Sequence, residues 1–408
     1  MQLGAAAGKQ FPDPVGSRRS AMRRLWLGAL GAGVLVASSA GGEPLKYTLG
    51  GEVAGYADTD NVYVLTPSLS LGASQPTGAW KANASYLVDI VTAASVDIVS
   101  TASPRWTEVR NAGALNVDYQ PQNFGVNLGG SVSREPDYLS WYVGGSFRVE
   151  MYDKRFTPLL GYSYSQDTAG RKDTPFSVYS LELERNTIQV GAEIVLNPSS
   201  RLTLSTEAVL EDGRQEKPYR YLPLFSAEIA PTVPRGASVD LVNSLRLSGE
   251  MGERLPDTRR RYSVSGEFAT RDGDHTLRVS ERLYGDTWGV LATTTDAIYV
   301  LGIGGGFRAW PHLRLHLQDG ASFWQRAYVA EPASGQISYP SLRTGDRELS
   351  PLLTATAGGG IEYATSTIPN TGWRFTGLVD VGRTSYFDAL YIDSRTSFLV
   401  SLMAGHTL

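Results

Sequence analysis

The sequence predicts an all-β fold: a transmembrane outer-membrane β-barrel of about 16 antiparallel strands, with short periplasmic turns and long extracellular loops. Three observations predict this fold. Polar and apolar residues alternate along most of the chain after residue 44, the lengths of the connections alternate too, and the N-terminus reads as an export signal.

The alternation has a period of two, which is typical of strands with two unlike faces. In one segment, for example, Leu313, Leu315 and Leu317 alternate with Arg314 and His316. Segments of this kind are expected at 45–56, 62–73, 79–90, 108–119, 124–134, 138–151, 155–166, 184–197, 200–212, 258–271, 274–286, 289–308, 311–326, 347–364, 371–384 and 390–408. Gly304 to Gly306 fall inside one of them, where glycine would bend the barrel wall.

The predicted connections between these segments differ in length by parity. Short turns such as Pro311-His312 and Pro369-Asn-Thr-Gly372 follow every second segment. The longest connections lie between them, near residues 91–107, 167–183, 213–257 and 327–346. A soluble β-sandwich or propeller has no reason to separate its loops in this way, whereas a membrane barrel does.

The N-terminal segment predicts export. Four arginines precede the apolar run Leu25 to Ala37, and small residues follow up to Ala40. We expect a signal peptide at 1–40, with Met22 as the alternative start, and a single barrel domain at 41–408. The apolar run is short for a membrane anchor. Export without cysteine suits the outer membrane of a Gram-negative cell, with lipid and the barrel-assembly machinery as partners.

Composition and motifs argue against other classes of function. Lys+Arg (37) and Asp+Glu (41) nearly balance, which predicts no nucleic-acid partner. Among only four histidines, His312 and His316 share one strand face but would lie about 13 Å apart, too far to share a metal. No nucleophile elbow, zinc motif or phosphate loop is present. We therefore expect no enzyme activity, catalytic residue, metal site or cofactor.

Charged residues mark the polar faces of the predicted strands. The candidate lumen-lining residues are Arg259, Arg261, Arg271, Arg278, Arg282, Arg314, Arg374, Glu150, Glu193, Glu207, Glu211 and Glu267. Two interpretations stay open. These charges either form a transverse field that orients polar solutes in a wet lumen, or form arginine–carboxylate pairs that brace the wall.

One octapeptide occurs twice in tandem, in DIVTAASVDIVSTASP at residues 89–104. Its Asp and Ser spacing favours a compact element of two turns at the outer end of the third strand; a simple strand extension is the alternative. The residues singled out are Asp89, Ser95, Asp97, Ser103 and Pro104. Two carboxylates without further named ligands do not define a calcium site.

This stretch, together with Lys217-Pro-Tyr-Arg220, Asp286-Thr-Trp-Gly289 and Gln325-Arg-Ala-Tyr328, resembles an uncharacterised family of Gram-negative outer-membrane proteins, the domain-of-unknown-function family numbered 3570. The resemblance covers most of the mature chain. It implies an outer-membrane barrel and no assigned activity, and it makes a partner in envelope electron transfer conceivable.

Two functions fit these observations. The first is a porin-like channel that passes or gates small polar solutes through a polar lumen. The second is a structural or docking barrel without a through-path, whose outer loops hold an envelope partner, with residues 213–257 folded as a hairpin or cap.

Overall fold

The structure is a computed structural model, which describes residues 45–75, 79–93, 106–333, 336–366 and 371–408. The helices in these ranges are all too short to cross a membrane.

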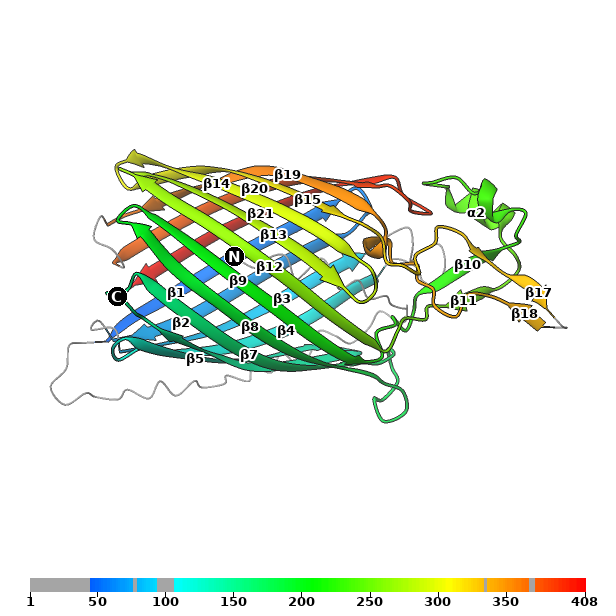
Figure 1. Ribbon diagram of the computed structural model, residues 1–408, viewed down its shortest axis with the longest axis horizontal. Coiled ribbons are helices and arrows are strands. Elements are labelled where there is room, and N and C mark those ends of the chain that lie inside the picture. Colours follow the sequence, from blue (N-terminus) through cyan, green and yellow to red (C-terminus); the bar gives the residue numbers. More distant parts are fainter. Residues whose placement is uncertain (1–44, 76–78, 94–105, 334–335, 367–370) are drawn as a thin grey trace, which may run out of the picture.

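A closed antiparallel barrel of 16 strands dominates the structure (Figure 1), as predicted. The strands follow one another in chain order around the barrel, and the last pairs with the first to close it. They are β1 (Lys46–Asp58), β2 (Tyr63–Ser74), β3 (Trp80–Ala93), β4 (Trp106–Tyr119), β5 (Phe124–Glu135), β6 (Tyr138–Val149), β7 (Phe156–Ala169), β8 (Leu181–Asn197), β9 (Ser200–Gly213), β12 (Thr258–Asp272), β13 (His275–Asp286), β14 (Leu291–Gly304), β15 (Phe307–Gln318), β19 (Leu352–Ala364), β20 (Gly372–Tyr386) and β21 (Ser394–Thr407).

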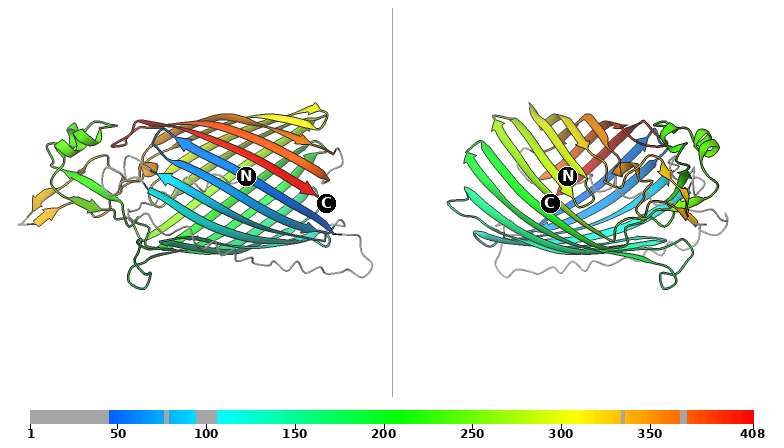
Figure 2. Two further views of the ribbon diagram at one scale, coloured as in Figure 1. Left: turned by 180° about the vertical axis from the view of Figure 1, so that it is seen from behind. Right: turned by 45° about the vertical axis from the view of Figure 1, so that its right-hand side comes forward.

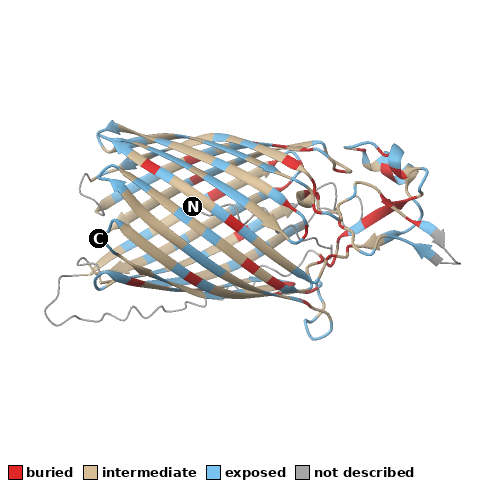
Figure 3. Ribbon diagram, viewed as in Figure 1, coloured by how far each residue is buried: buried red, intermediate tan, exposed pale blue. Residues whose placement is uncertain are grey.

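The outer surface of the barrel is largely apolar. Alternate residues of each strand point away from the lumen, and most of these outward residues are apolar. Leu313, Leu315 and Leu317 are each about half exposed on this surface. Figure 3 shows how few barrel residues are buried. A closed barrel leaves no unpaired strand edge, so this surface can face hydrocarbon. The barrel therefore spans the outer membrane.

An acidic residue lies at mid-strand on the outward face of β13. Glu281 lies between Val279 and Leu283 on the outward face of β13. Its carboxylate accepts hydrogen bonds from the hydroxyls of Thr293 and Thr295, the latter at 2.6 Å. The two threonines on β14 thus partly compensate a charge that faces lipid.

The structure corrects one turn and the strands on either side of it. Gly304, Gly305 and Gly306 all have positive φ angles and form the turn between β14 and β15. The prediction of a turn at Pro311 is wrong, because Pro311 pairs with Gly359 inside the sheet. The strand predicted at 311–326 consequently begins at Phe307 and ends at Gln318.

The two ends of the barrel differ. Turns such as 198–199, 273–274 and 305–306 lie at the end that also holds the C-terminus, and we assign this end to the periplasm. The connections 214–257, 319–351 and 387–393 lie at the opposite, outer end.

These three outer connections fold together into a cap that stands beyond the barrel (Figures 1 and 2). Its hydrophobic core includes Phe225, Val233 and Val242, with Val329 and Leu390 packed against them from the other two connections. A small sheet in the order β11-β10-β16 crosses the cap. The elements of these connections are β10 (Tyr221–Phe225), η2 (Ala230–Thr232), α2 (Val239–Leu245), β11 (Glu250–Gly252), β16 (Tyr328–Val329), β17 (Glu331–Ala333), β18 (Gln336–Ser338) and η3 (Arg347–Leu349).

Candidate functional site

The inner face of the barrel is the candidate site. Inward positions follow from the alternation: on β12, Arg259, Arg261 and Glu267 alternate with outward Tyr262 and Val264. The same rule places Arg271, Arg278, Arg282, Arg314, Arg374, Glu193, Glu207 and Glu211 on the inner face.

Glu150 is the exception among the predicted lumen-lining residues. The strand expected at 138–151 ends at Val149, so Glu150 lies in the periplasmic turn that follows. Its carboxylate accepts a hydrogen bond from Gln120 at 2.6 Å and pairs with Lys154 at 3.0 Å. The Lys154 ammonium donates to this carboxylate and lowers the pKa of Glu150. Glu150 therefore belongs to the periplasmic rim.

On one side of the lumen, the described residues include no charged residue at mid-strand, and we call this side the neutral wall. It comprises the mid-strand inward positions of β2 to β7, which include Ser68, Asn83, Asn116, Ser131 and Ser163. Charged residues on these strands, such as Asp89 and Asp118, lie toward the strand ends. The neutral wall thus offers short hydroxyl and amide side chains to the lumen.

The other side, which we call the charged wall, consists of the inward positions of β9 to β20. Arg282 pairs here with Glu207 at 3.4 Å, and Arg314 pairs with Asp296 at 3.5 Å. Toward the outer end, the side chain of Asp286 is fully buried and accepts hydrogen bonds from Arg259 Nε at 2.9 Å and from the Tyr284 hydroxyl at 2.7 Å. Apart from Arg271, which pairs with Asp274 of the neighbouring turn at 3.7 Å, the arginines that sequence indicated are paired across strands.

A bridge of three side chains crosses four strands in the middle of the charged wall. His312 Nδ1 lies 2.9 Å from an Asp380 oxygen, and Nε2 lies 3.1 Å from an Asp296 oxygen. Asp380 reaches over Gly358 of the intervening strand. A Cβ at Gly358 would lie 2.0 Å from the Asp380 Oδ1 atom, so only glycine permits this contact. The bridge fixes His312 between two carboxylates.

One arrangement recurs three times along this side of the barrel: a glutamate on one strand contacts an arginine on each neighbouring strand. Glu211 pairs with Arg185 and Arg261, each at 2.8 Å. Glu267 pairs with Arg278 at 2.8 Å and Arg201 at 3.6 Å. These sets, and the third formed by Arg308, Glu362 and Arg374, are called triplets below. Direct or diagonal register between neighbouring strands brings each pair together.

The outer mouth of the lumen is narrowed by η3. Gln318 Nε2 donates to the backbone oxygens of Glu348 (2.8 Å) and Ser350 (2.9 Å). The Glu348 carboxylate accepts from the Tyr386 hydroxyl at 2.9 Å and pairs with Arg395 at 3.1 Å. Gln318, Tyr386 and Arg395 are inward residues, so η3 lies against the inner wall.

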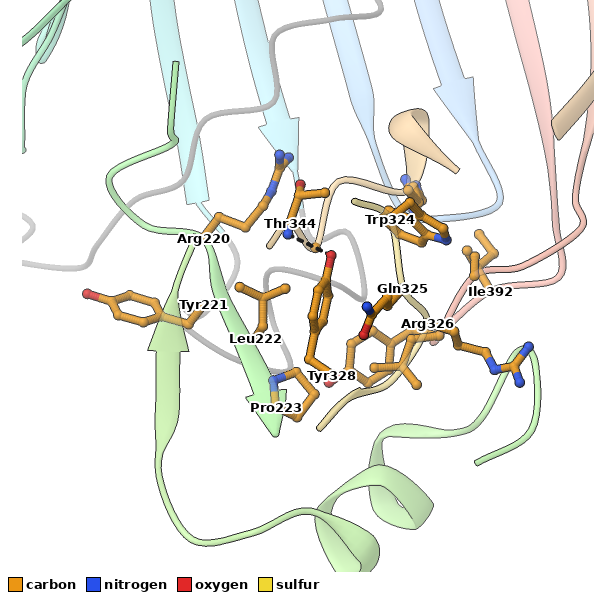
Figure 4. A pocket seen from close by; sticks show the side chains of 15 residues that line it. Arg220, Tyr221, Leu222, Pro223, Trp324, Gln325, Arg326, Tyr328, Thr344 and Ile392 are labelled. Atoms are coloured by element: carbon orange, nitrogen blue, oxygen red, sulfur yellow. Dashed lines mark hydrogen bonds between the residues drawn. The ribbon is translucent and has the colours of Figure 1, made fainter. Parts of the chain in front are cut away.

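Buried polar contacts link the cap to this mouth. Arg220 pairs with Asp346 at 2.7 Å and with Glu253 at 3.3 Å. The Tyr328 hydroxyl accepts a hydrogen bond from the Thr344 N–H at 2.9 Å, beside a pocket lined by residues of the cap (Figure 4). Burial raises the pKa of the Glu253 carboxyl. Burial also acts to raise the pKa of Asp346, but the charges of Arg220 and Lys217 and the hydrogen bonds to the carboxylate together outweigh it and lower that pKa.

The doubled octapeptide is described only at its start. Asp89 is buried and accepts hydrogen bonds from Thr66 and from Arg110 Nε, each at 2.6 Å. This pairing occupies both oxygens of the Asp89 carboxylate. Ser95, Asp97, Ser103 and Pro104 lie outside the described residues.

Three carboxylates at the outer rim could hold a hard cation. The ligand atoms of Glu108, Glu135 and Asp137 all lie within 4.8 Å of one another. Asp137 also accepts a hydrogen bond from the Tyr219 hydroxyl at 3.1 Å, and burial raises the pKa of its carboxyl. Sequence analysis did not identify this group, because its members come together only through the pairing of β4 with β5 and the turn that follows.

Sequence analysis also missed Arg308 and Glu362 of the third triplet. The wrong turn predicted at Pro311 assigned Arg308 to the preceding strand, so its place on the inner face of β15 was not recognised. The three consecutive glycines before Phe307 were the available signal, because positive φ angles favour glycine in tight turns.

The closed barrel, its apolar outer surface and its polar inner face define an outer-membrane β-barrel protein. The chain belongs to the family described as "Protein of unknown function (DUF3570)", whose model matches residues 58–375. No curated protein matches the sequence.

Solved structures with a similar fold include several outer-membrane proteins. OpdK from Pseudomonas aeruginosa is 8% identical, with 90% of this chain and 100% of that chain covered and a TM-score of 0.42. A bacterial polysaccharide outer-membrane secretin is 8% identical, with coverages of 88% and 97% and a TM-score of 0.43. OccAB1 from Acinetobacter baumannii is 10% identical, with coverages of 89% and 96% and a TM-score of 0.38. At these identities the likeness is one of fold alone.

Proposed function

We propose that this barrel is a channel that passes small polar solutes across the outer membrane. The observation that supports it most is the polar inner face, which runs from the periplasmic turns to the outer mouth on every side of a 16-stranded barrel. Barrels of this strand number enclose enough space for an aqueous path. A purely structural barrel would not need two chemically different walls.

The outer mouth supports a selective channel over a wide, unrestricted one. The position of η3 against the inner wall narrows the entrance, and Gln318, Tyr386 and Arg395 hold it there. A solute that enters from outside passes the Glu348 carboxylate first and then reaches the charged wall. The size limit of the channel would be set at this point.

A liposome-swelling assay with the purified, folded protein tests the proposal. Proteoliposomes in an isotonic uncharged pentose should swell faster than empty liposomes, and larger oligosaccharides should enter more slowly. Folding is checked separately by the heat-dependent shift in gel mobility. Correctly folded protein that gives no swelling with the pentose would rule out a solute channel.

A second candidate function is docking of an envelope partner on the cap, and one observation favours it. The β17–β18 hairpin extends from the cap, with Ile337 largely exposed and Tyr339 also exposed. Exposed apolar residues on a two-stranded hairpin are a typical contact surface for another protein.

Site-specific photocrosslinking in intact cells tests docking. A crosslinker at position 337 should yield a discrete adduct, whereas one at the exposed Val178, in the outer connection 170–180, serves as the control. Equal labelling patterns from the two positions would exclude a dedicated partner at the hairpin.

A further inference from the structure

We infer that the periplasmic half of the charged wall is an oxyanion-binding site that makes the channel selective for small anions. This inference rests on the proposed channel function and names its solute class. It is carried by two of the three triplets, which lie near the periplasmic ends of their strands: Arg201–Glu267–Arg278 and Arg308–Glu362–Arg374.

The arginines of these triplets face the lumen, and their carboxylates lie beneath them. The side chains of Arg308 and Arg374 are 62% and 53% exposed, but Glu362 between them is only 16% exposed. Arg201 and Arg278 are each 47% exposed against 26% for Glu267. A solute in the lumen therefore meets guanidinium groups before it meets a carboxylate.

The charge balance favours anions as well. Each triplet contains two arginines and one glutamate, so each has an excess of one positive charge. Glu193, which pairs with Arg201 at 3.5 Å, offsets one of the two excess charges. The Arg308–Glu362–Arg374 triplet keeps its own excess and is the stronger candidate for contact with a solute.

The guanidinium groups of that triplet are available for hydrogen bonding. Arg308 Nη1 and Arg374 Nε lie 3.8 Å and 3.7 Å from the two Glu362 oxygens. These separations allow Coulomb attraction but are too long for hydrogen bonds, so Glu362 holds both arginines without occupying their N–H groups. Guanidinium N–H groups bind carboxylate and phosphate oxygens in pairs.

An aromatic ring lies next to this triplet. Trp310 is an inward residue two positions from Arg308, and its ring covers Gly360, where a Cβ would lie 2.3 Å from the ring. Gly360 itself is two positions from Glu362 on β19. The site therefore combines two guanidinium groups with a flat apolar surface, which suits a small organic oxyanion such as a carboxylate or an organic phosphate.

The opposite wall supports the same conclusion. The hydroxyls and amides of the neutral wall can hydrogen-bond to a permeating solute, but they contribute no negative charge at mid-strand. Toward the periplasmic end of this side, Asp118 is offset by Arg148 at 3.7 Å. The field across the lumen is therefore set by the charged wall. Partial exposure to water and salt weakens this field, and we expect a selectivity of moderate size.

Reversal potentials of the reconstituted protein in a gradient of potassium chloride test the inference. The wild-type channel should favour chloride over potassium by roughly twofold or more. Replacing both exposed arginines, in Arg308→Gln/Arg374→Gln, should abolish most of this preference. Glu362→Gln should raise it, because the same site then loses its negative charge.

Arg235→Gln is the matched control, since it also removes one arginine but lies in the cap, where Arg235 pairs with Asp393 at 2.7 Å. It should leave the chloride preference unchanged. A conducting channel that favours potassium, or one whose preference is the same in the double variant, would overturn the inference. Absence of any conductance would instead count against the channel itself, so the two failures are distinguishable.

Adding two different anions to the chloride solution distinguishes carboxylate binding from phosphate binding. Acetate and inorganic phosphate, each added on the periplasmic side, should reduce the chloride current through the wild type more than through the double variant. The stronger blocker identifies the preferred oxygen chemistry. Equal currents in the presence and absence of both anions would contradict a binding site at the triplets.

Discussion

The neutral wall and the charged wall belong to one barrel but are built in different ways. The neutral wall uses short side chains such as Ser68 and Ser131, and connections 59–62 and 136–137 on this side are short. The charged wall uses long side chains that pair across strands, and the three connections of the cap leave its strands or those next to them. One wall therefore presents an uncharged lining of short side chains, while the other supplies charge, the narrowed mouth and the cap.

The difference has a physical cause. A hydroxyl side chain makes its hydrogen bonds with nearby groups or with water. Its removal therefore leaves few hydrogen-bonding groups without a partner. A buried carboxylate depends on the arginine beside it, and the loss of one partner leaves the other charge unpaired. The stability of the charged wall should thus be sensitive to single substitutions in a way that the neutral wall is not.

Asp286→Ala should have the largest effect on stability. The side chain of Asp286 is fully buried and accepts hydrogen bonds from Arg259, Tyr284 and the backbone N–H groups of Trp288 and Val290. Its removal leaves Arg259 without its partner and should cost about 3–5 kcal/mol. Ser131→Ala on the neutral wall should stay within about 0.5 kcal/mol of wild type.

Unfolding by urea from lipid vesicles measures both free energies. Similar losses for Asp286→Ala and Ser131→Ala would show that the two walls do not differ in the way described.

Glycine substitutions give the second test. Gly358→Ala should destabilise the barrel by about 1–3 kcal/mol, because its Cβ would collide with Asp380 and break the bridge to His312. Gly161 also faces the lumen, but a Cβ there would come no closer than 3.5 Å to its neighbours. Gly161→Ala should therefore be neutral or stabilise by up to about 1 kcal/mol.

The same urea titrations apply to this pair. If Gly161→Ala proves as costly as Gly358→Ala, the glycine of the charged wall is not needed for the cross-strand bridge.

A substitution on the lipid-facing side of the charged wall should change the free energy of unfolding by a smaller amount and in the opposite direction. Glu281→Leu should stabilise the barrel by about 1 kcal/mol, because it removes a carboxylate from a surface that faces hydrocarbon. Thr295→Val should destabilise it, since the Glu281 carboxylate then loses the donor at 2.6 Å. Loss of stability in Glu281→Leu would indicate that protein, and not lipid, covers this position.

A charge placed on the neutral wall should produce the smallest change in free energy. Ser131→Arg adds a guanidinium to the lumen opposite the charged wall and should raise the preference for chloride by roughly twofold. Ser131→Asp should lower it by a similar factor. An unchanged reversal potential in both variants would mean that position 131 does not border the permeation path.

The barrel could be predicted from the sequence because each strand has one face toward lipid and one toward the aqueous lumen. Apolar and polar residues therefore alternate along it. The same alternation placed Arg278, Arg282 and Arg314 on inner faces. The sequence could not pair Glu267 with Arg201 and Arg278, because this contact depends on the register of three strands.

The errors in the sequence-based prediction can be traced to particular residues. The choice of Pro311 over Gly304–Gly306 as a turn hid Arg308, and it extended one strand into the outer connection. In the cap, Phe225 and Val242 pack against residues more than 80 positions away in sequence, which no period reveals. A folded cap could be expected from its apolar residues, but its partners in the other connections could not.

Recording from single wild-type channels in a planar bilayer, under a gradient of potassium chloride, tests the central claim most directly. The two walls predict stepwise conductance with a reversal potential displaced toward the chloride equilibrium value. Folded protein that inserts but gives no conductance steps, or gives steps that reverse toward the potassium value, would contradict a channel governed by its charged wall.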